Sequence, residues 1–175
     1  GVWDKKGGFE LTNKSVGIIG LGNIGSEVIR ILSVFGCNIY GNDIVDKVSF
    51  AKENSVKLVS KEEIFKKCDI ISIHAPLTDY TRNLFTKKVF KKMKSNSILI
   101  NTSRGGIINE NDLKEALLNK IIFAAAIDVY NEEPPKNLDL INLPNLICTP
   151  HIGGNSSEAV YNMGLSAIEF LRKNI

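Results

Sequence analysis

Ser15-Val-Gly-Ile-Ile-Gly-Leu-Gly-Asn-Ile-Gly25 is an apolar run that leads directly into three glycines, spaced Gly20-x-Gly22-x-x-Gly25. An amphipathic pattern follows and predicts a helix over residues 23–35, because apolar side chains recur there at helical spacing. One face of this helix is expected to carry Ile24, Val28, Ile31, Leu32 and Phe35. Gly36 suits its C-terminal cap. The segment therefore predicts a strand, a tight glycine turn and a helix in direct succession.

Such a strand–turn–helix unit is typical of domains that bind a dinucleotide. Gly20 makes the tight turn, Gly22 lets a pyrophosphate approach the backbone, and Gly25 lets the helix pack against the strand. The N-terminus of the helix offers free N–H groups and the positive end of its dipole to the phosphates. Asp43 lies 18 residues after Gly25 and ends the next apolar run. Its carboxylate can accept hydrogen bonds from an adenosine ribose and repels a 2′-phosphate, so the pattern predicts NAD rather than NADP.

Short apolar runs alternate with helical patterns along most of the chain. The expected strands are Ser15–Gly20, Cys37–Asn42, Val56–Val59, Asp69–His74, Ser97–Asn101, Phe123–Asp128 and Leu146–Thr149. The expected helices are Asn23–Phe35, Ser60–Cys68, Thr86–Lys92, Asn109–Lys120 and Ser156–Lys173. Several strands are nearly continuous Ile, Val and Leu, as in parallel sheets that helices cover on both faces. The alternation predicts an α/β fold, a doubly wound parallel sheet of the Rossmann type with about seven strands.

Composition and charge exclude several classes of partner. The 175 residues, 43% hydrophobic and 23% charged, fit one globular domain, and a net charge of +3 gives no argument for nucleic acid. A group of lysines is interpreted as a solvated face: Lys87, Lys88, Lys91, Lys92 and Lys94. Cys37, Cys68 and Cys148 have neither disulfide-framework nor metal-ligand spacing, so we expect no metal and a reducing, cytoplasmic location. No apolar run approaches the roughly 18 residues that span a bilayer, so no membrane partner is expected.

Polar residues gather at the ends of the expected strands. These groups are Asp43, His74-Ala-Pro76, Thr102-Ser-Arg-Gly-Gly106, Asp128 and His151-Ile-Gly-Gly154. In a doubly wound sheet the ligand crevice lies beyond the carboxyl ends of the strands. Each group alone has an ordinary structural explanation, but all of them at one edge predict a single cleft. His74 is interpreted as structural or close to the cofactor.

Several of these motifs, in this order, resemble the D-isomer-specific 2-hydroxyacid dehydrogenases. They are Gly20–Gly25, Asn101-Thr-Ser-Arg-Gly105, Ala126-Ile-Asp-Val129, Glu133-Pro134 and Thr149-Pro-His-Ile-Gly-Gly154. The resemblance implies NAD as cofactor and a catalytic set of Arg104, Glu133 and His151. Glu133 is preferred to Glu132 because it precedes Pro134 and lies five residues after Asp128. The resemblance, together with the glycine pattern and the polar residues at the strand ends, implies a set of cofactor contacts. These residues are Gly20, Gly22, Asn23, Ile24, Gly25, Asp43, His74, Pro76, Thr102, Ser103, Arg104, Asp128, His151, Gly153 and Gly154.

The same resemblance carries further expectations. Residues 151–159 are most similar to the phosphoglycerate dehydrogenase branch, which implies hydride transfer between NAD(H) and 3-phosphoglycerate or 3-phosphohydroxypyruvate. Residues 1–175 are expected to form the NAD-binding domain, with residues 155–175 returning as a helix toward a separate substrate domain that holds the substrate phosphate. The family commonly dimerises through this domain, so a homodimer is expected. The alternative is a dinucleotide-sensing regulatory module, similar to the C-terminal-binding transcriptional corepressors.

Overall fold

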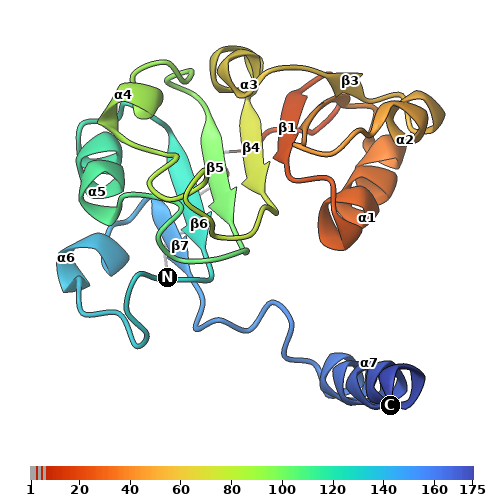
Figure 1. Cartoon of the computed structure of the whole chain (residues 1–175). Helices are drawn as coiled ribbons and strands as arrows, with labels where there is room; N and C mark the ends of the chain where they lie inside the picture. The colour runs from red at the N-terminus through yellow and green to blue at the C-terminus, as the bar shows by residue number, and fades with distance from the viewer. Residues whose placement is uncertain (1–2, 4, 6) are drawn as a thin grey trace.

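A seven-stranded parallel sheet forms the centre of the computed structural model, which describes residues 3, 5 and 7–175 (Figure 1). Its strand order is β3-β2-β1-β4-β5-β6-β7. The strands are β1 (Ser15–Ile19), β2 (Asn38–Asn42), β3 (Lys57–Leu58), β4 (Ile70–Ile73), β5 (Ile98–Asn101), β6 (Ala124–Ile127) and β7 (Leu146–Cys148). The order reverses direction at β1 and β4, as in doubly wound folds. The predicted fold class and all seven strands are confirmed.

Seven α-helices occupy the connections and the C-terminal part of the chain described by the structure. They are α1 (Asn23–Leu32), α2 (Val48–Glu53), α3 (Lys61–Lys67), α4 (Lys87–Phe90), α5 (Glu110–Leu118), α6 (Leu138–Ile141) and α7 (Ser157–Asn174). A 3₁₀ turn, Ser33–Phe35, continues α1. The sequence predictions missed the two short helices α2 and α6, and α4 is shorter than predicted.

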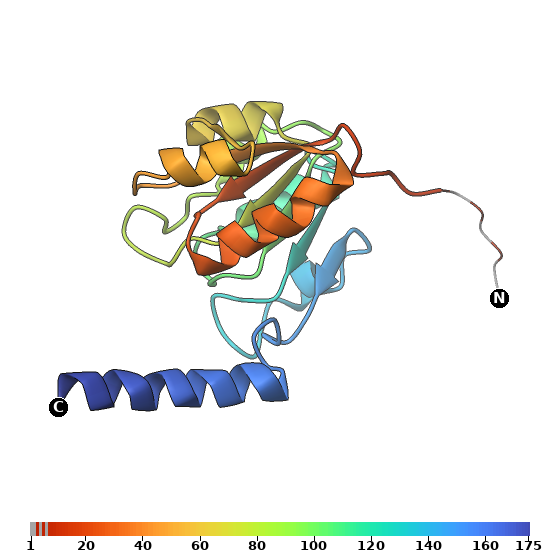
Figure 2. The same ribbon diagram turned by 90° about the vertical axis from the view of Figure 1, so that its right-hand side faces the viewer.

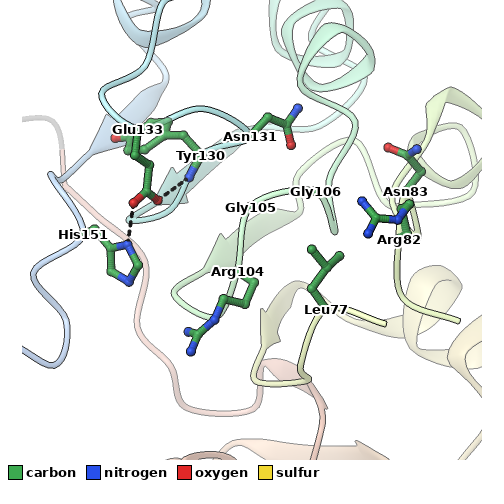
Figure 3. A pocket seen from close by; sticks show the side chains of 10 residues that line it. All are labelled: Leu77, Arg82, Asn83, Arg104, Gly105, Gly106, Tyr130, Asn131, Glu133 and His151. Carbon is green, nitrogen blue, oxygen red and sulfur yellow. Dashed lines mark hydrogen bonds and ion pairs between the residues drawn. The ribbon is translucent and has the colours of Figure 1, made fainter. Parts of the chain in front are cut away.

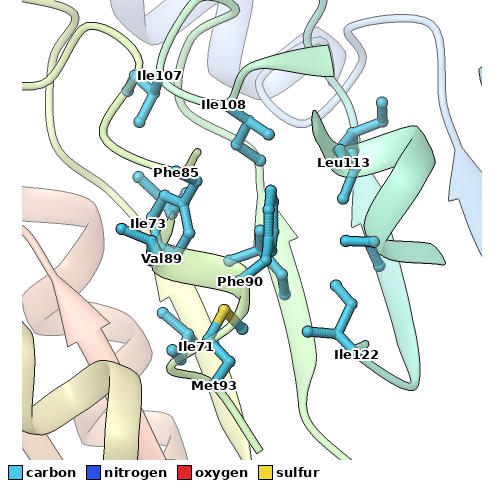
Figure 4. Packing of buried hydrophobic residues seen from close by; sticks show 14 of the residues in the cluster. Ile71, Ile73, Phe85, Val89, Phe90, Met93, Ile107, Ile108, Leu113 and Ile122 are labelled. Atoms are coloured by element: carbon cyan, nitrogen blue, oxygen red, sulfur yellow. The ribbon is translucent and has the colours of Figure 1, made fainter. Parts of the chain in front are cut away.

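The core divides between the two faces of the sheet because successive side chains of a strand point to opposite sides. On one face, Ile18 packs with Ile29 of α1 and Ala51 of α2. On the other, larger face, Ile73 packs with Phe85, Phe90 and side chains from α3 and α5 (Figure 4). Both faces are therefore covered around β1, where the glycine turn begins.

The predicted buried face of α1 is wrong in part. Ile24 and Ile31 are 66% and 62% exposed, and Phe35 is 47% exposed, whereas Ile29 is fully buried. The reason is Gly25, whose missing side chain lets the helix approach the backbone of the glycine turn. The side of α1 that carries Gly25 and Ile29, one turn apart, therefore faces the sheet. The apolar side chains left outside form an exposed α1 patch, consisting of Ile24, Ile31, Val34 and Phe35.

Helix α7 lies apart from the sheet and its covering helices (Figure 2). It has no buried residue, although Val160, Tyr161, Ile168 and Phe170 are among its apolar side chains. Its N-terminus is capped by the Ser156 hydroxyl, which accepts a hydrogen bond from Ala159 N at 3.1 Å. The sequence predicted this helix, and its expected return toward a substrate domain stays a prediction.

Charged side chains pair across the surface around α4. The Nζ atoms of Lys87, Lys92 and Lys94 lie 2.6, 2.9 and 2.7 Å from carboxylate oxygens of Glu115, Glu62 and Asp69. Within the described residues, no helix is long and apolar enough to cross a membrane. The same residues hold no group of three or more His, Cys, Asp or Glu side chains that could bind a metal ion.

Candidate functional site

The glycine turn between β1 and α1 is closed by two backbone contacts that only glycine allows. A Cβ on Gly20, whose φ is +94°, would lie 2.6 Å from Ala75 N at the end of β4. A Cβ on Gly25 would lie 2.0 Å from Gly20 O. Nothing lies within 4 Å of a Cβ built on Gly22, the residue before α1. No side chain caps α1 and no acid occupies its first turn, so its first N–H groups are open to an anion such as a phosphate.

Asp43 lies directly after β2 and bonds to the glycine turn. Its Oδ2 accepts a hydrogen bond from Leu21 N at 2.6 Å, and its Oδ1 accepts one from Val45 N at 2.9 Å. A carboxylate can accept about four hydrogen bonds, so both oxygens keep lone pairs for a ribose. A hollow of about 260 Å³ opens beside it, lined by residues 41–47, Leu58 and Val59. This hollow suits the adenosine end of a dinucleotide.

Asn101 at the end of β5 holds the loop that carries Arg104. It is only 2% exposed, and its Oδ1 accepts hydrogen bonds from Ser103 N at 3.1 Å and Ser103 Oγ at 2.8 Å. Its Nδ2 donates to Arg104 O at 3.0 Å. Sequence reasoning missed this role, although a polar side chain inside an apolar strand was a usable signal, because buried amides must find partners.

The Arg104 loop and the Glu133 loop touch through their backbones. A Cβ on Gly105 would lie 1.8 Å from Tyr130 O, so only glycine allows this approach. Glu110, at the start of α5, accepts a hydrogen bond from Asn131 N at 2.7 Å. The loop after β6 is thus fixed next to the loop after β5.

Glu133 and His151 lie within hydrogen-bond distance of each other at the edge of a cavity (Figure 3). Glu133 Oε2 lies 2.8 Å from His151 Nδ1, and Glu133 Oε1 accepts a hydrogen bond from Tyr130 N at 3.1 Å. These two bonds, with the His151 bond the larger influence, hold the pKa of Glu133 below its ordinary value. Since Nδ1 is engaged by the carboxylate, the other ring nitrogen of His151, Nε2, is the one available to a ligand.

The cavity has a volume of about 500 Å³. Its lining residues are Leu77, Arg82, Asn83, Arg104, Gly105, Gly106, Tyr130, Asn131, Glu133 and His151. Figure 3 shows the Glu133–His151 pair at one side, Arg104 in the middle, and Arg82 with Asn83 at the opposite side. The three residues predicted to be catalytic therefore line one cavity, although their roles remain predictions.

Asp128 holds the turn on which His151 lies. It is 4% exposed, and its carboxylate accepts hydrogen bonds from Thr149 Oγ1 at 2.5 Å, Ile152 N at 2.9 Å and Gly153 N at 2.8 Å. Burial alone would raise the pKa of Asp128, but these donors outweigh it and keep the pKa below its ordinary value. His151 itself has a φ of +54°, so the turn needs such support.

The remaining predicted cofactor residues lie outside this cavity. His74 is half-buried and its Nε2 lies 2.9 Å from Ser72 Oγ, while burial lowers its pKa and favours the neutral ring. Pro76 and Thr102 are exposed at the ends of β4 and β5, and Gly154 has open space around it. Arg82 and Asn83 are lining residues that the sequence did not suggest, because a lone arginine in a loop is usually a surface residue.

Comparisons with known proteins agree with this arrangement. A family model described as "D-isomer specific 2-hydroxyacid dehydrogenase, NAD binding domain" matches residues 1–153. The chain is 42% identical over 176 residues to D-3-phosphoglycerate dehydrogenase of Methanocaldococcus jannaschii, covering 99% of this chain and 34% of that protein. It is 37% identical to hydroxypyruvate reductase of Thermotoga maritima, covering 100% of this chain and 58% of that protein.

A solved structure gives the same result. D-lactate dehydrogenase with NAD⁺ from Lactobacillus jensenii superposes with a TM-score of 0.82 and 33% identity, covering 89% of this chain and 50% of that one. The chain spans about a third of the phosphoglycerate dehydrogenase and about half of the lactate dehydrogenase. Fold, glycine turn and matched residues lead to one conclusion: the chain belongs to the D-isomer specific 2-hydroxyacid dehydrogenases and is an NAD-binding domain of that family.

Proposed function

We propose that the whole protein transfers a hydride between NAD(H) and a D-2-hydroxy acid or its 2-keto acid. The observation that carries this proposal is the Glu133–His151 pair, with 2.8 Å between Oε2 and Nδ1, facing the same cavity as Arg104. Keto-acid reduction needs a proton donor, an anion that orients this donor, and a cation that binds the substrate carboxylate.

His151 serves as the proton donor and acceptor. In keto-acid reduction, negative charge grows on the carbonyl oxygen, and the protonated ring delivers its Nε2 proton to that oxygen. In the opposite direction the neutral ring accepts the hydroxyl proton at the same nitrogen. Ionised Glu133 at Nδ1 favours the charged ring and fixes its orientation.

Arg104 binds the substrate carboxylate through its planar guanidinium group and polarises the adjacent carbonyl. Its backbone is held by Asn101, whose Nδ2 donates to Arg104 O at 3.0 Å. When bound, NADH would supply the hydride for the carbonyl carbon, and His151 would supply the proton that completes the hydroxyl group. The phosphates of the cofactor would lie at Gly22 and the N-terminus of α1, and its adenosine ribose at Asp43.

The proposed substrate pair is 3-phosphoglycerate and 3-phosphohydroxypyruvate. The support is the resemblance of residues 151–159 and the 42% identity to an archaeal D-3-phosphoglycerate dehydrogenase. The relatives named above are all enzymes, so they give no support to the regulatory module that the sequence alone left open.

A conservative exchange of Arg104 tests this function. In the whole protein, Arg104→Lys keeps the positive charge but loses the bidentate hydrogen bonds to the substrate carboxylate. The KM for the keto acid should therefore rise about tenfold or more. NADH oxidation is followed at 340 nm for the wild type and the variant with 3-phosphohydroxypyruvate, pyruvate and glyoxylate. If the wild type reduces none of these keto acids, the proposed function is wrong. An unchanged KM in the variant would remove the role given to Arg104.

Asp43 should make the chain prefer NADH to NADPH. A hydrogen bond to a charged group is worth roughly 1.5–3 kcal/mol, so Asp43→Ala should weaken NADH binding about 10- to 100-fold. Calorimetry with both cofactors measures the preference. Asp139→Ala is the control, since Asp139 lies on α6 and does not line this hollow. Equal affinity of the unchanged chain for NADH and NADPH would contradict the prediction.

The domain organisation, assembly and location are also proposals. Residues 1, 2, 4 and 6 lie outside the described residues, and the remainder forms the proposed NAD-binding domain. Helix α7 would pack its exposed apolar side chains against a substrate domain of the whole protein. The exposed α1 patch supports the proposed homodimer, which light scattering would test. A cytoplasmic location remains an inference from the cysteine pattern.

A further inference from the structure

The cavity continues past Arg104 to a second arginine. Arg82 lines the side opposite the Glu133–His151 pair (Figure 3). Its Nη1 lies 3.8 Å from the position that a Cβ on Gly106 would occupy. Since Gly106 is two residues from Arg104, the separation of their Cα atoms is at most about 7 Å. The two guanidinium groups therefore share one cavity.

Hydrogen bonds fix the loop that carries Arg82. Thr81 Oγ1 donates to Pro76 O at 2.6 Å, and Arg82 N donates to Thr78 O at 2.8 Å. The next residue, Asn83, has a φ of +49°, and its N–H donates to Gly106 O at 2.8 Å. The backbone of Arg82 is thus tied to its own turn and to the Arg104 loop.

Among the described residues, no carboxylate forms an ion pair with Arg82 or with Arg104. By contrast, the surface residue Arg30 pairs with Glu27. Arg82 and Arg104 place two positive charges on the lining of one cavity, and an anionic ligand bound there would offset both. A guanidinium group binds either a carboxylate or a phosphate through two parallel hydrogen bonds.

We propose that Arg82 binds the second anionic group of a substrate whose carboxylate is bound at Arg104, and thereby selects 2-keto acids that end in a phosphate. This inference rests on the proposed function for the role of Arg104. It assigns part of the phosphate recognition to the NAD-binding domain itself, whereas the family resemblance placed that recognition in the substrate domain. The cofactor phosphates are not the ligand of Arg82, because no residue of the glycine turn lines this cavity.

Two substrates that differ only in the phosphate test the proposal in the whole protein. The kcat/KM ratio of 3-phosphohydroxypyruvate to hydroxypyruvate is measured for the wild type, Arg82→Gln and the control Arg30→Gln. Loss of a charge-assisted hydrogen bond should lower this ratio at least tenfold in Arg82→Gln, through a higher KM for the phosphorylated substrate. The ratio should stay unchanged in Arg30→Gln, and NADH affinity should stay unchanged in both variants.

A binding measurement separates this inference from the proposed function. Calorimetry with 2-phosphoglycolate, which carries a carboxylate and a phosphate but no keto group, needs no turnover. Arg82→Gln should weaken its binding at least tenfold relative to the wild type and Arg30→Gln. An equal loss of kcat/KM on both keto acids, a loss of NADH affinity, or an unchanged 2-phosphoglycolate affinity overturns the proposal. If the wild type reduces no keto acid, the proposed function fails and the 2-phosphoglycolate result alone decides on Arg82.

Discussion

His151→Ala in the whole protein should lower kcat for keto-acid reduction by about two to four decades, the usual contribution of general acid–base catalysis. The variant loses the Nε2 proton that the proposed reaction delivers to the carbonyl oxygen. NADH affinity should remain within a few-fold, because the glycine turn and Asp43 lie away from the ring. The double variant with Glu133→Gln should be no slower than His151→Ala alone, because residues that act as one unit do not add their losses.

Glu133→Gln alone should shift the pH dependence of both reaction directions. The lowered pKa of Glu133 means that its carboxylate is ionised at neutral pH, where its charge stabilises the protonated His151 ring. Glu133→Gln keeps the size of the side chain but removes the anion beside the protonated ring. Reduction needs the protonated ring, so its alkaline limb moves to lower pH, and oxidation needs the neutral ring, so its acidic limb moves the same way.

The measurement is kcat/KM against pH in both directions for the wild type and Glu133→Gln. Glu132→Gln is the matched control, since it removes the adjacent carboxylate that has no bond to His151 among the described contacts. If the limbs of the pH profile shift in Glu132→Gln instead, Glu132 is the carboxylate partner of His151. Limbs that stay in place in both variants would show that His151 acts without a carboxylate partner.

Gly105→Ala should destabilise the fold more than the exchanges of Arg82, Arg104, Glu133 and His151 described above. The new methyl group would lie 1.8 Å from Tyr130 O, which is backbone and can yield only if two loops move apart. Overpacking of this kind costs about 1–3 kcal/mol, which corresponds to a fall in Tm of roughly 2–12 °C for a domain of this size. The same movement would separate Arg104 from Glu133.

Thermal unfolding followed by circular dichroism measures this effect. Gly164→Ala is the control, because nothing lies within 4 Å of its Cβ position on α7 and alanine favours a helix. An unchanged Tm in Gly105→Ala would mean that the two loops are not in contact in solution.

The sheet was predictable because each of its strands has a local signal. β1, β4 and β5 consist mostly of Ile, Leu and Val, and their alternation with helical patterns specifies a parallel sheet. The short helices α2 and α6 carry too few residues to show a helical period. The orientation of α1 depends on how closely Gly25 approaches the turn, which is a tertiary contact that the apolar spacing of α1 does not contain.

For the candidate site, the sequence predicted which loops contain the site residues. The carboxyl ends of parallel strands meet at one edge, so Arg104 and His151 were expected together. The hydrogen-bond partners of Asp128 could not be predicted, because its bonds to Ile152 N and Gly153 N depend on the path of a loop. Arg82 had no signal, since its position in the cavity results from the turn that begins at Pro76.

The residues that stabilise the sheet and the residues that line the cavity are nearly separate sets. The side chains of His151 and Glu133 are 46% and 40% exposed, whereas Ile18, Ile73 and Leu99 are fully buried. Removing a reactive side chain therefore leaves the packed interior intact. A folded protein with His151→Ala should therefore keep its sites for keto acid and NADH while turning them over about two to four decades more slowly, which lengthens the lifetime of the ternary complex by the same factor.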